Sequence, residues 1–211
     1  MNIRCFPLSC NCYIVSDEKG NTVVIDPCER GAEIYSYLET QDLKLCGVII
    51  THAHFDHIYG LTSLVEEAEC CGDGIPVYIH KDDAAAMSSE SKNLSGTLFR
   101  MPYKYTGALV GVADGDVLKI GDMSFEVMWC PGHTPGSALF IEHSEKTIFA
   151  GDVLFEGSIG RTDFPGGNIG KMKQSLEKIM KLDDDYKVYS GHGSSTTIGN
   201  ERNFNPYIAQ L

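Results

Sequence analysis

The sequence predicts an α+β protein in which stacked β-sheets are flanked by helices. Short β-prone runs follow one another closely along the chain, amphipathic segments lie between some of them, and no repeat or linker divides the chain. The chain has 211 residues, of which 43% are hydrophobic and 22% charged. This composition is typical of a globular protein that fills a core. We therefore expect residues 1–211 to form a single domain.

In the first part of the chain, strands and helices are expected in alternation. β-Branched and aromatic residues predict strands over residues 3–6, 12–16, 22–26, 47–51 and 76–79. Apolar residues recur at helical spacing over 29–40 and 61–68, and Asp82 is in position to cap a short helix that runs to Met87.

The second part of the chain predicts more strands and one long helix. Strands are expected over residues 117–120, 124–129, 138–142, 147–150 and 187–190. Residues 169–180 have the apolar spacing of an amphipathic helix, with Asn168 as its cap. The segment 88–110 is rich in Ser, Gly and Thr and predicts a long loop.

Charge and hydropathy exclude two classes of partner. Lys and Arg number 17 against 29 Asp and Glu, which gives a net charge of −12. Such a surface repels nucleic acid, whose binding depends on Lys and Arg. No apolar stretch approaches the roughly 18 residues of a membrane span, and no export signal is visible. We expect a cytoplasmic protein that binds neither nucleic acid nor membrane; its oligomeric state stays open.

The eight cysteines contain no C-x-x-C pair, which argues against a zinc finger. A chain of this length does not need disulfides to fold. We therefore expect reduced thiols that act as small buried hydrophobic residues. A redox role for the pairs Cys10/Cys12 and Cys70/Cys71 stays open.

The segment from Thr51 to His57 reads T-H-A-H-F-D-H and directly follows an apolar strand. Residues two apart in an extended loop point the same way, so His52 and His54 can bind one ion. Asp56 and His57, where a helix begins, would face a neighbouring position. Imidazole and carboxylate groups without thiolate favour Zn, Fe or Mn.

Three further segments place a possible ligand just after a predicted strand. They contain His133 in C-P-G-H-T-P-G, Asp152 in I-F-A-G-D and His192 in Y-S-G-H-G. Because one metal needs about four ligands, the full set suffices for two ions that share a carboxylate. The remaining histidines, His80 and His143, are expected to be structural or solvated.

In their order from Asp26 to His192, these motifs resemble those of the metallo-β-lactamase-fold hydrolases. The resemblance implies an αββα sandwich of two mixed sheets flanked by helices, with the site at the edge of the sheets. It implies that the first metal is held by His52, His54 and His133, and the second by Asp56, His57 and His192. Asp152 would bridge the two ions, and Asp26 would orient the ligand loop.

The segment G-S-I-G-R-T-D from Gly157 and the ending T-T-I-G with E-R and N-P resemble the glyoxalase II-like branch, the hydroxyacylglutathione hydrolase-like enzymes. The match is to its shorter members, without a separate C-terminal helical domain. It implies two divalent ions, with zinc expected and Fe or Mn as alternatives, which generate hydroxide to cleave an anionic thioester. Asp56 would also orient the hydroxide, and Arg161 would bind substrate. An ion pair of Arg161 with Asp163 or Asp56 is the structural alternative.

Two other functions stay open. A mononuclear Fe(II) oxygenase that resembles the persulfide dioxygenases of this fold would use His52, His133 and Asp152. A non-catalytic binding protein is disfavoured by the complete ligand set. We also expect the net-positive loop 88–110 to form a flap, with Phe99, Met101, Tyr103 or Tyr105 in contact with the acyl group, unless it is simply solvated.

Overall fold

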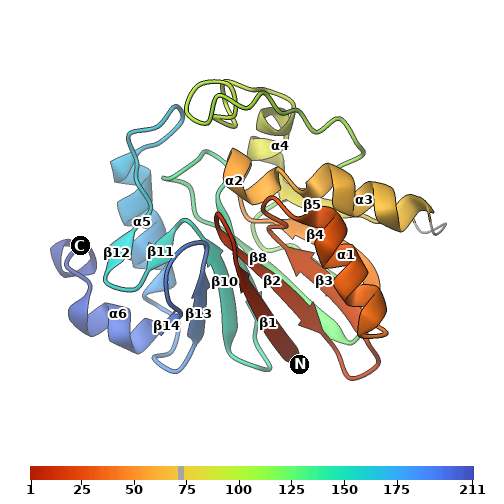
Figure 1. Cartoon of the computed structure of the whole chain (residues 1–211). Helices are drawn as coiled ribbons and strands as arrows, with labels where there is room; N and C mark the ends of the chain where they lie inside the picture. The colour runs from red at the N-terminus through yellow and green to blue at the C-terminus, as the bar shows by residue number, and fades with distance from the viewer. Residues whose placement is uncertain (71–73) are drawn as a thin grey trace.

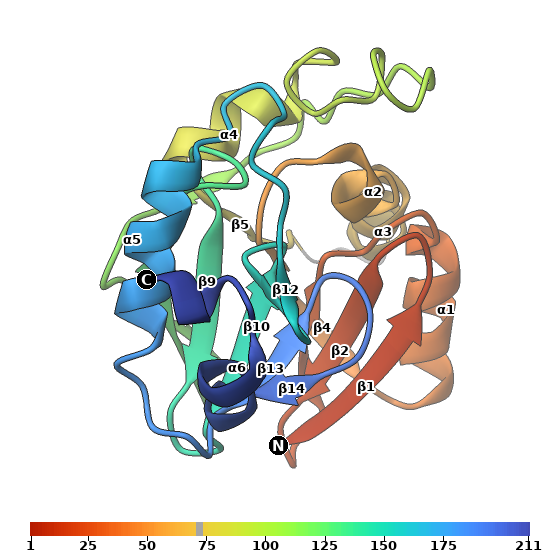
Figure 2. The same ribbon diagram turned by 90° about the vertical axis from the view of Figure 1, so that its left-hand side faces the viewer.

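The computed structural model describes residues 1–70 and 74–211, and its elements lie in four layers of helices, sheet, sheet and helices (Figure 1). Figure 2 shows the two sheets facing each other, with α1 and α3 outside the first sheet and α5 and α6 outside the second. The predicted αββα sandwich is therefore confirmed.

Six strands form the first sheet, in the same order in space as in the sequence. They are β1 Asn2–Pro7, β2 Asn11–Ser16, β3 Asn21–Ile25, β4 Lys44–Ile50, β5 Val77–His80 and β6 Val110–Val112. The strands β1 to β3 pair antiparallel and β3 to β6 pair parallel, so the sheet is mixed.

The second sheet has the order β14-β13-β10-β9-β8-β7. Its strands are β7 Val117–Ile120, β8 Met123–Trp129, β9 Ala138–Glu142, β10 Thr147–Gly151, β13 Lys187–Ser190 and β14 Thr196–Thr197. The pair β10–β13 is parallel and the other pairs are antiparallel. A small separate hairpin follows β10 and consists of β11 Leu154–Phe155 and β12 Ser158–Ile159.

The helices lie on the outer faces and at one end of the sandwich (Figures 1 and 2). They are α1 Gly31–Thr40, α2 Phe55–Ile58, α3 Leu61–Cys70, α4 Lys81–Met87, α5 Ile169–Ile179, α6 Ile198–Phe204 and a final 3₁₀ turn Ile208–Gln210. Asn168 caps α5 as predicted, because its side chain accepts a hydrogen bond from Lys171 N. The cap of α4 is His80, which accepts from Asp82 N, so the prediction that Asp82 is the cap is wrong.

Alternation along the strands produces three apolar layers. Val23 and Ile25 of β3 point into the layer between the sheets, where they lie with Phe125 and Phe149. Val24, between them in the sequence, points the other way into the layer beneath α1 and α3. A third cluster joins the second sheet to α5. Because both faces of each sheet are buried in apolar layers, polar side chains at the strand ends are accommodated mainly at the sheet edges.

The end of the chain supports the hairpin, a contact that the sequence did not predict. The buried Glu201 of α6 accepts from Gly157 N in the turn between β11 and β12, at 2.8 Å. Asn205 donates to Ser158 O at 3.0 Å. The hairpin is thereby fixed against the second sheet.

The structure corrects one prediction about the cysteines, since Cys10 and Cys28 form a disulfide. Tyr13 of β2 pairs with Ile25 of β3, and the two cysteines lie three residues beyond this pair on either strand. Antiparallel pairing therefore brings them together. Cys12 and Cys130 are buried free thiols, as expected. Cys5 and Cys70 are exposed and Cys46 is half-buried, so the expectation of buried thiols is wrong for these three. Cys71 lies outside the described residues.

None of the helices within the described ranges is long and apolar enough to span a membrane.

Reduction of the disulfide should release two further thiols and destabilise the chain. Its cysteines are 18 residues apart, and closing a loop of that size is worth about 3 kcal/mol of unfolding free energy. Urea unfolding with and without a phosphine reductant measures the difference. A Cys10→Ala, Cys28→Ala double variant should unfold at the same urea concentration under both conditions. An oxidised wild-type chain no more stable than this variant would contradict the prediction.

Candidate metal centre

Polar side chains gather where five strands end at one edge of the sandwich. Asp26 follows β3, and the 51–57 loop that carries His52 and His54 follows β4. In the second sheet, β8, β10 and β13 run in one direction. The segments after them carry His133, Asp152 and His192. The structure therefore brings every predicted ligand to the same place.

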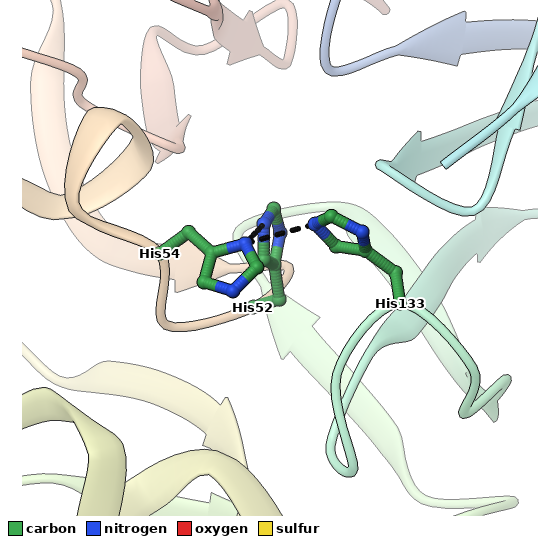
Figure 3. A group of neighbouring side chains, drawn as sticks. All are labelled: His52, His54 and His133. Carbon is green, nitrogen blue, oxygen red and sulfur yellow. Dashed lines mark hydrogen bonds between the residues drawn. The ribbon is translucent and has the colours of Figure 1, made fainter. Parts of the chain in front are cut away.

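Three histidines form the first group, shown in Figure 3. The Nδ1 atom of His54 lies 3.1 Å from Nε2 of His52 and 2.8 Å from Nε2 of His133. All three side chains are buried. Three ring nitrogens that point at one another in this way can share an ion at their centre.

Partners on the far side of two rings fix which nitrogen faces the centre. His133 Nδ1 lies 2.7 Å from the backbone oxygen of Arg161 and donates to it. His52 Nδ1 lies 3.2 Å from Thr51 Oγ1. Thr51 Oγ1 donates its own proton to Asp26 Oδ2, so Nδ1 is the donor in both rings. Nε2 then keeps a lone pair for a metal, which is the usual arrangement at metal-binding histidines.

Asp56, His57 and His192 form the second group. His192 Nε2 lies 3.3 Å from Asp56 Oδ2, and His57 Nε2 lies 4.0 Å from the same atom. His192 is the most exposed of the three, with 37% of its side chain accessible.

Asp152 lies between the two groups. Its Oδ2 is 3.5 Å from Nε2 of His133 in the first group and 3.5 Å from Nε2 of His192 in the second. Its Oδ1 is 3.4 Å from His57 Nε2. One carboxylate in contact with both groups has the placement that a bridging ligand requires.

Asp26 connects the ligand loop to the end of β3. It lies in the left-handed region with φ of 50°, an uncommon conformation for a residue with a side chain. Its carboxylate accepts from Thr51 N at 2.9 Å and from Thr51 Oγ1 at 2.6 Å, and lies 2.8 Å from His57 Nδ1. The predicted orienting contact of Asp26 is present in the structure.

A glycine makes room for these side chains. A Cβ atom on Gly191, the residue before His192, would collide with Asp152 Oδ1 and lie 2.8 Å from His57 Cε1. The glycine therefore lets the His192 segment approach the other ligands closely.

The donor set fits one or two divalent ions. Among the described residues, the buried side-chain atoms without a hydrogen-bond partner are His54 Nε2, His57 Nε2 and Asp152 Oδ1. The last two point toward each other at 3.4 Å, and buried polar atoms are normally satisfied. Imidazole and carboxylate donors without thiolate suit Zn, Fe and Mn.

Electrostatics keep His52 and His54 neutral and Asp152 charged. Burial, together with the neighbouring histidines, lowers the pKa of His52 well below its usual range and lowers that of His54 to about 3. Burial alone would raise the pKa of Asp152, but the charge of His57 and a hydrogen bond from it hold the pKa well below its ordinary value. Burial lowers the pKa of His57, but the neighbouring carboxylates raise it, and they raise the pKa of His192 as well. His52 and His54 are thus in the neutral state that binds metal, whereas His57 and His192 release their extra proton when a metal binds.

A cleft of about 440 Å³ opens beside the two groups. Its floor contains His54, Asp56, His133, Asp152 and His192, and its walls are Leu94, Leu98, Phe99, Phe155, Ser158, Ile159, Arg161 and Phe164. Most of the wall is apolar.

Arg161 lies in the cleft wall but is held by its own loop. Its Nε and Nη2 atoms donate to Asp163, and its guanidinium lies 3.7 Å above the Phe164 ring. The structural alternative, an ion pair with Asp163, is thus present, and the guanidinium still borders the cleft.

The loop 88–110 contributes to the cleft in part as predicted. Phe99 lines it and packs on Phe55 with ring centroids 4.9 Å apart. Tyr105 is buried in the core beneath the helices, and Tyr103 bonds Thr62 at 2.9 Å. Met101 is exposed and does not line the cleft.

The two histidines expected to be structural lie outside both ligand groups. His80 caps α4 and stacks on Trp129. His143 lies 2.6 Å from Glu126 and 2.7 Å from Tyr186 Oη.

Sequence reasoning missed several residues that shape this site. Phe155 and Ile159 lie in the hairpin, which is too short to produce a strand signal. Leu94 and Leu98 lie in a segment without periodicity. Asp83, which binds the backbone of both histidine loops, gave no signal beyond that of an acidic residue near a helix start.

Comparisons with known proteins agree with this geometry. A family model for the metallo-beta-lactamase superfamily matches residues 5–192. The hydroxyacylglutathione hydrolase GloC of Haemophilus influenzae is 34% identical over 99% of this chain and 98% of its own. The probable metallo-hydrolase YqgX of Bacillus subtilis is 35% identical over 96% of this chain and 93% of its own.

Solved structures resemble the chain over nearly its full length. The B3 metallo-beta-lactamase BLEG-1 has a TM-score of 0.90 and 32% identity, covering 98% of this chain and 99% of that one. TTHA1623 in a di-iron-bound form has a TM-score of 0.84 and 30% identity, covering 98% and 100%. ETHE1 from Myxococcus xanthus has a TM-score of 0.79 and 27% identity, covering 100% and 85%.

Replacing Asp152 tests whether the two groups act as one centre. Because its carboxylate contacts both groups, Asp152→Ala should lose at least one ion per chain, as measured by elemental analysis of purified protein. His143→Ala removes a histidine outside both groups and should leave the metal content unchanged. Full retention of two ions by Asp152→Ala would contradict the binuclear arrangement.

Proposed function

The chain belongs to the metallo-beta-lactamase superfamily, and on that premise we propose that it is a binuclear metal-dependent hydrolase of anionic hydroxyacyl thioesters. His52, His54 and His133 would hold one ion and Asp56, His57 and His192 the other, with Asp152 in contact with both groups. Zinc is the metal we expect, with iron or manganese as alternatives. The observation that carries this proposal is the position of Asp152, within 3.5 Å of a histidine of either group.

Metal ions held by these residues would lower the pKa of a bound water toward neutrality and polarise the carbonyl of a substrate. The chain supplies the framework for this chemistry. Asp56, at the floor of the cleft, accepts a hydrogen bond from the attacking water and orients it. The apolar walls exclude other water, which strengthens electrostatic interactions at the reacting carbonyl.

The residues that line the cleft favour a leaving group that needs no proton donor. Among the described residues that line it, the titratable ones are the proposed ligands and Arg161. An amine leaving group needs a proton donor, whereas a thiolate, with a pKa near 8.5, leaves with little help. A thioester therefore suits this cleft better than a β-lactam, the substrate class in the name of one structural neighbour. The relative GloC is named as a hydroxyacylglutathione hydrolase, which supports the choice of a thioester substrate.

Purification without oxygen, followed by metal analysis and assay, tests the proposal. We expect two ions per chain, release of thiol from a hydroxyacyl thioester without oxygen uptake, and loss of activity on chelation. A β-lactam should be turned over far more slowly. One iron per chain with oxygen uptake on a persulfide would overturn the proposal in favour of the oxygenase.

Arg161 should select anionic thioesters, and its partner Asp163 provides a matched control. Arg161→Ala should lower kcat/KM for a carboxylate-bearing thioester about tenfold, the low end for a charge-assisted hydrogen bond because Asp163 already neutralises the guanidinium. Asp163→Asn should raise the preference for the anionic substrate. The measurement is the ratio of kcat/KM for anionic and neutral thioesters of similar size. Equal losses for both substrates would show that Arg161 only holds its loop.

Phe99 should contribute apolar contact to the acyl group. It is 36% exposed at the cleft wall, so a bound acyl chain can cover the remaining surface. Phe99→Ala should raise KM about 3- to 10-fold for apolar acyl chains while the metal content stays unchanged. Met101→Ala, in the same segment but outside the cleft wall, should leave KM unchanged. Identical KM values for the two variants would mean that the loop is only a solvated surface.

A further inference from the structure

Asp83 is a buried carboxylate that joins the two loops carrying the three-histidine group. It lies on α4 and is 1% exposed. Its Oδ2 accepts from Ala53 N at 3.0 Å and from Thr134 Oγ1 at 2.8 Å, and its Oδ1 accepts from Gly136 N at 2.7 Å.

The donors to Asp83 lie next to the three histidines of the first group in the sequence. Ala53 lies between the ligands His52 and His54, and Thr134 directly follows the ligand His133. The two loops come from different sheets, after β4 and β8. A third element, α4, therefore connects the two loops through the Asp83 side chain. Its hydrogen bonds go to two backbone N–H groups and one hydroxyl group of these loops.

The local structure is shaped around this carboxylate. A Cβ atom on Gly136 would lie 2.5 Å from Asp83 N and 2.7 Å from its Cβ, so glycine lets the His133 loop approach α4. Burial raises the pKa of Asp83, and the hydrogen bonds from Thr134, Ala53 and Gly136 oppose the rise. A buried carboxylate is costly unless it is hydrogen-bonded, and here all three of its donors belong to the histidine loops.

Asp26 and Asp83 support the ligand loops at different points. Asp26 contacts Thr51 and the ring of His57, a proposed ligand of the second group. Asp83 contacts Ala53 and Thr134, which adjoin the three histidines of the first group. The separation of the two loops sets the distance from His133 to His52 and His54. An ion bound by all three rings depends on that distance.

We propose that Asp83 is a positioning residue that sets the spacing of the two histidine loops and thereby the metal affinity of the His52–His54–His133 group. This inference rests on the proposed function in that it takes the group to hold an ion. The carboxylate acts through backbone and hydroxyl donors. An uncharged amide in its place presents an NH₂ group to at least one N–H donor, so it loses at least one of the three hydrogen bonds and also the negative charge that strengthens the others.

The test is zinc binding by the full chain, with each group measured separately by competition against a chelator. The three-histidine group is titrated in a His192→Ala background and the second group in a His133→Ala background. Adding Asp83→Asn should weaken zinc binding 10- to 100-fold in the first background and leave the second within about twofold. Asp82→Asn, an exposed neighbour in the same turn of α4, should change neither.

A milder variant keeps the test decisive if Asp83→Asn does not fold. Thr134→Val removes one of the three hydrogen bonds and should weaken the first group about 3- to 10-fold. Unchanged zinc affinity in these variants, or equal weakening of both groups, would overturn the positioning role. Failure of the metal assignment on which this inference rests looks different, because the parent backgrounds would then bind no zinc at all; failure of thioester hydrolysis alone would leave these zinc affinities unchanged.

Discussion

The site depends on one topological constraint, namely that strands from both sheets end at a common edge. The parallel pairs β3–β4 and β10–β13, together with β8, deliver their carboxyl ends to that edge. With both faces of each sheet buried in apolar layers, the edge is where polar side chains can converge. Residues separated by 140 positions in the sequence, such as His52 and His192, therefore become parts of one centre.

Bringing these side chains together costs free energy, since buried imidazoles and carboxylates lose their hydration. The chain compensates by giving the ligands outer partners: Asp26 for His57, Thr51 for His52 and the Arg161 carbonyl for His133. These partners also fix which ring nitrogen faces the centre. Of the three buried side-chain atoms without a partner among the described residues, His57 Nε2 and Asp152 Oδ1 lie 3.4 Å apart, where an ion would satisfy both.

The sequence alone predicted the residues that converge at this edge, because the motif of residues 51–57 is local and each of the other residues follows a strand. It also predicted the layers, since closely spaced strands with helical segments between them indicate stacked sheets flanked by helices. It could not identify Asp83, because the donors on Ala53 and Gly136 belong to loops far away in the sequence and any buried acid near a helix start looks the same. The Cys10–Cys28 disulfide was missed for a related reason: only the register of β2 on β3 shows that the two loops meet. The hairpin β11–β12 was missed because strands of two residues have no period.

The same edge explains how the cleft can combine charge with an apolar wall. The proposed metal ligands occupy its floor, where the strand ends meet, and the walls come from segments outside the two large sheets: the loop 88–110, the hairpin and the loop with Arg161. These wall segments are fixed by contacts away from the floor, such as Phe99 on Phe55 and the hairpin turn on Glu201. Changes in the wall can therefore alter which substrate fits without moving a proposed ligand. In this architecture the sheets position the proposed ligands and the loops form the wall against which a substrate would lie, which is how one fold can support several chemistries.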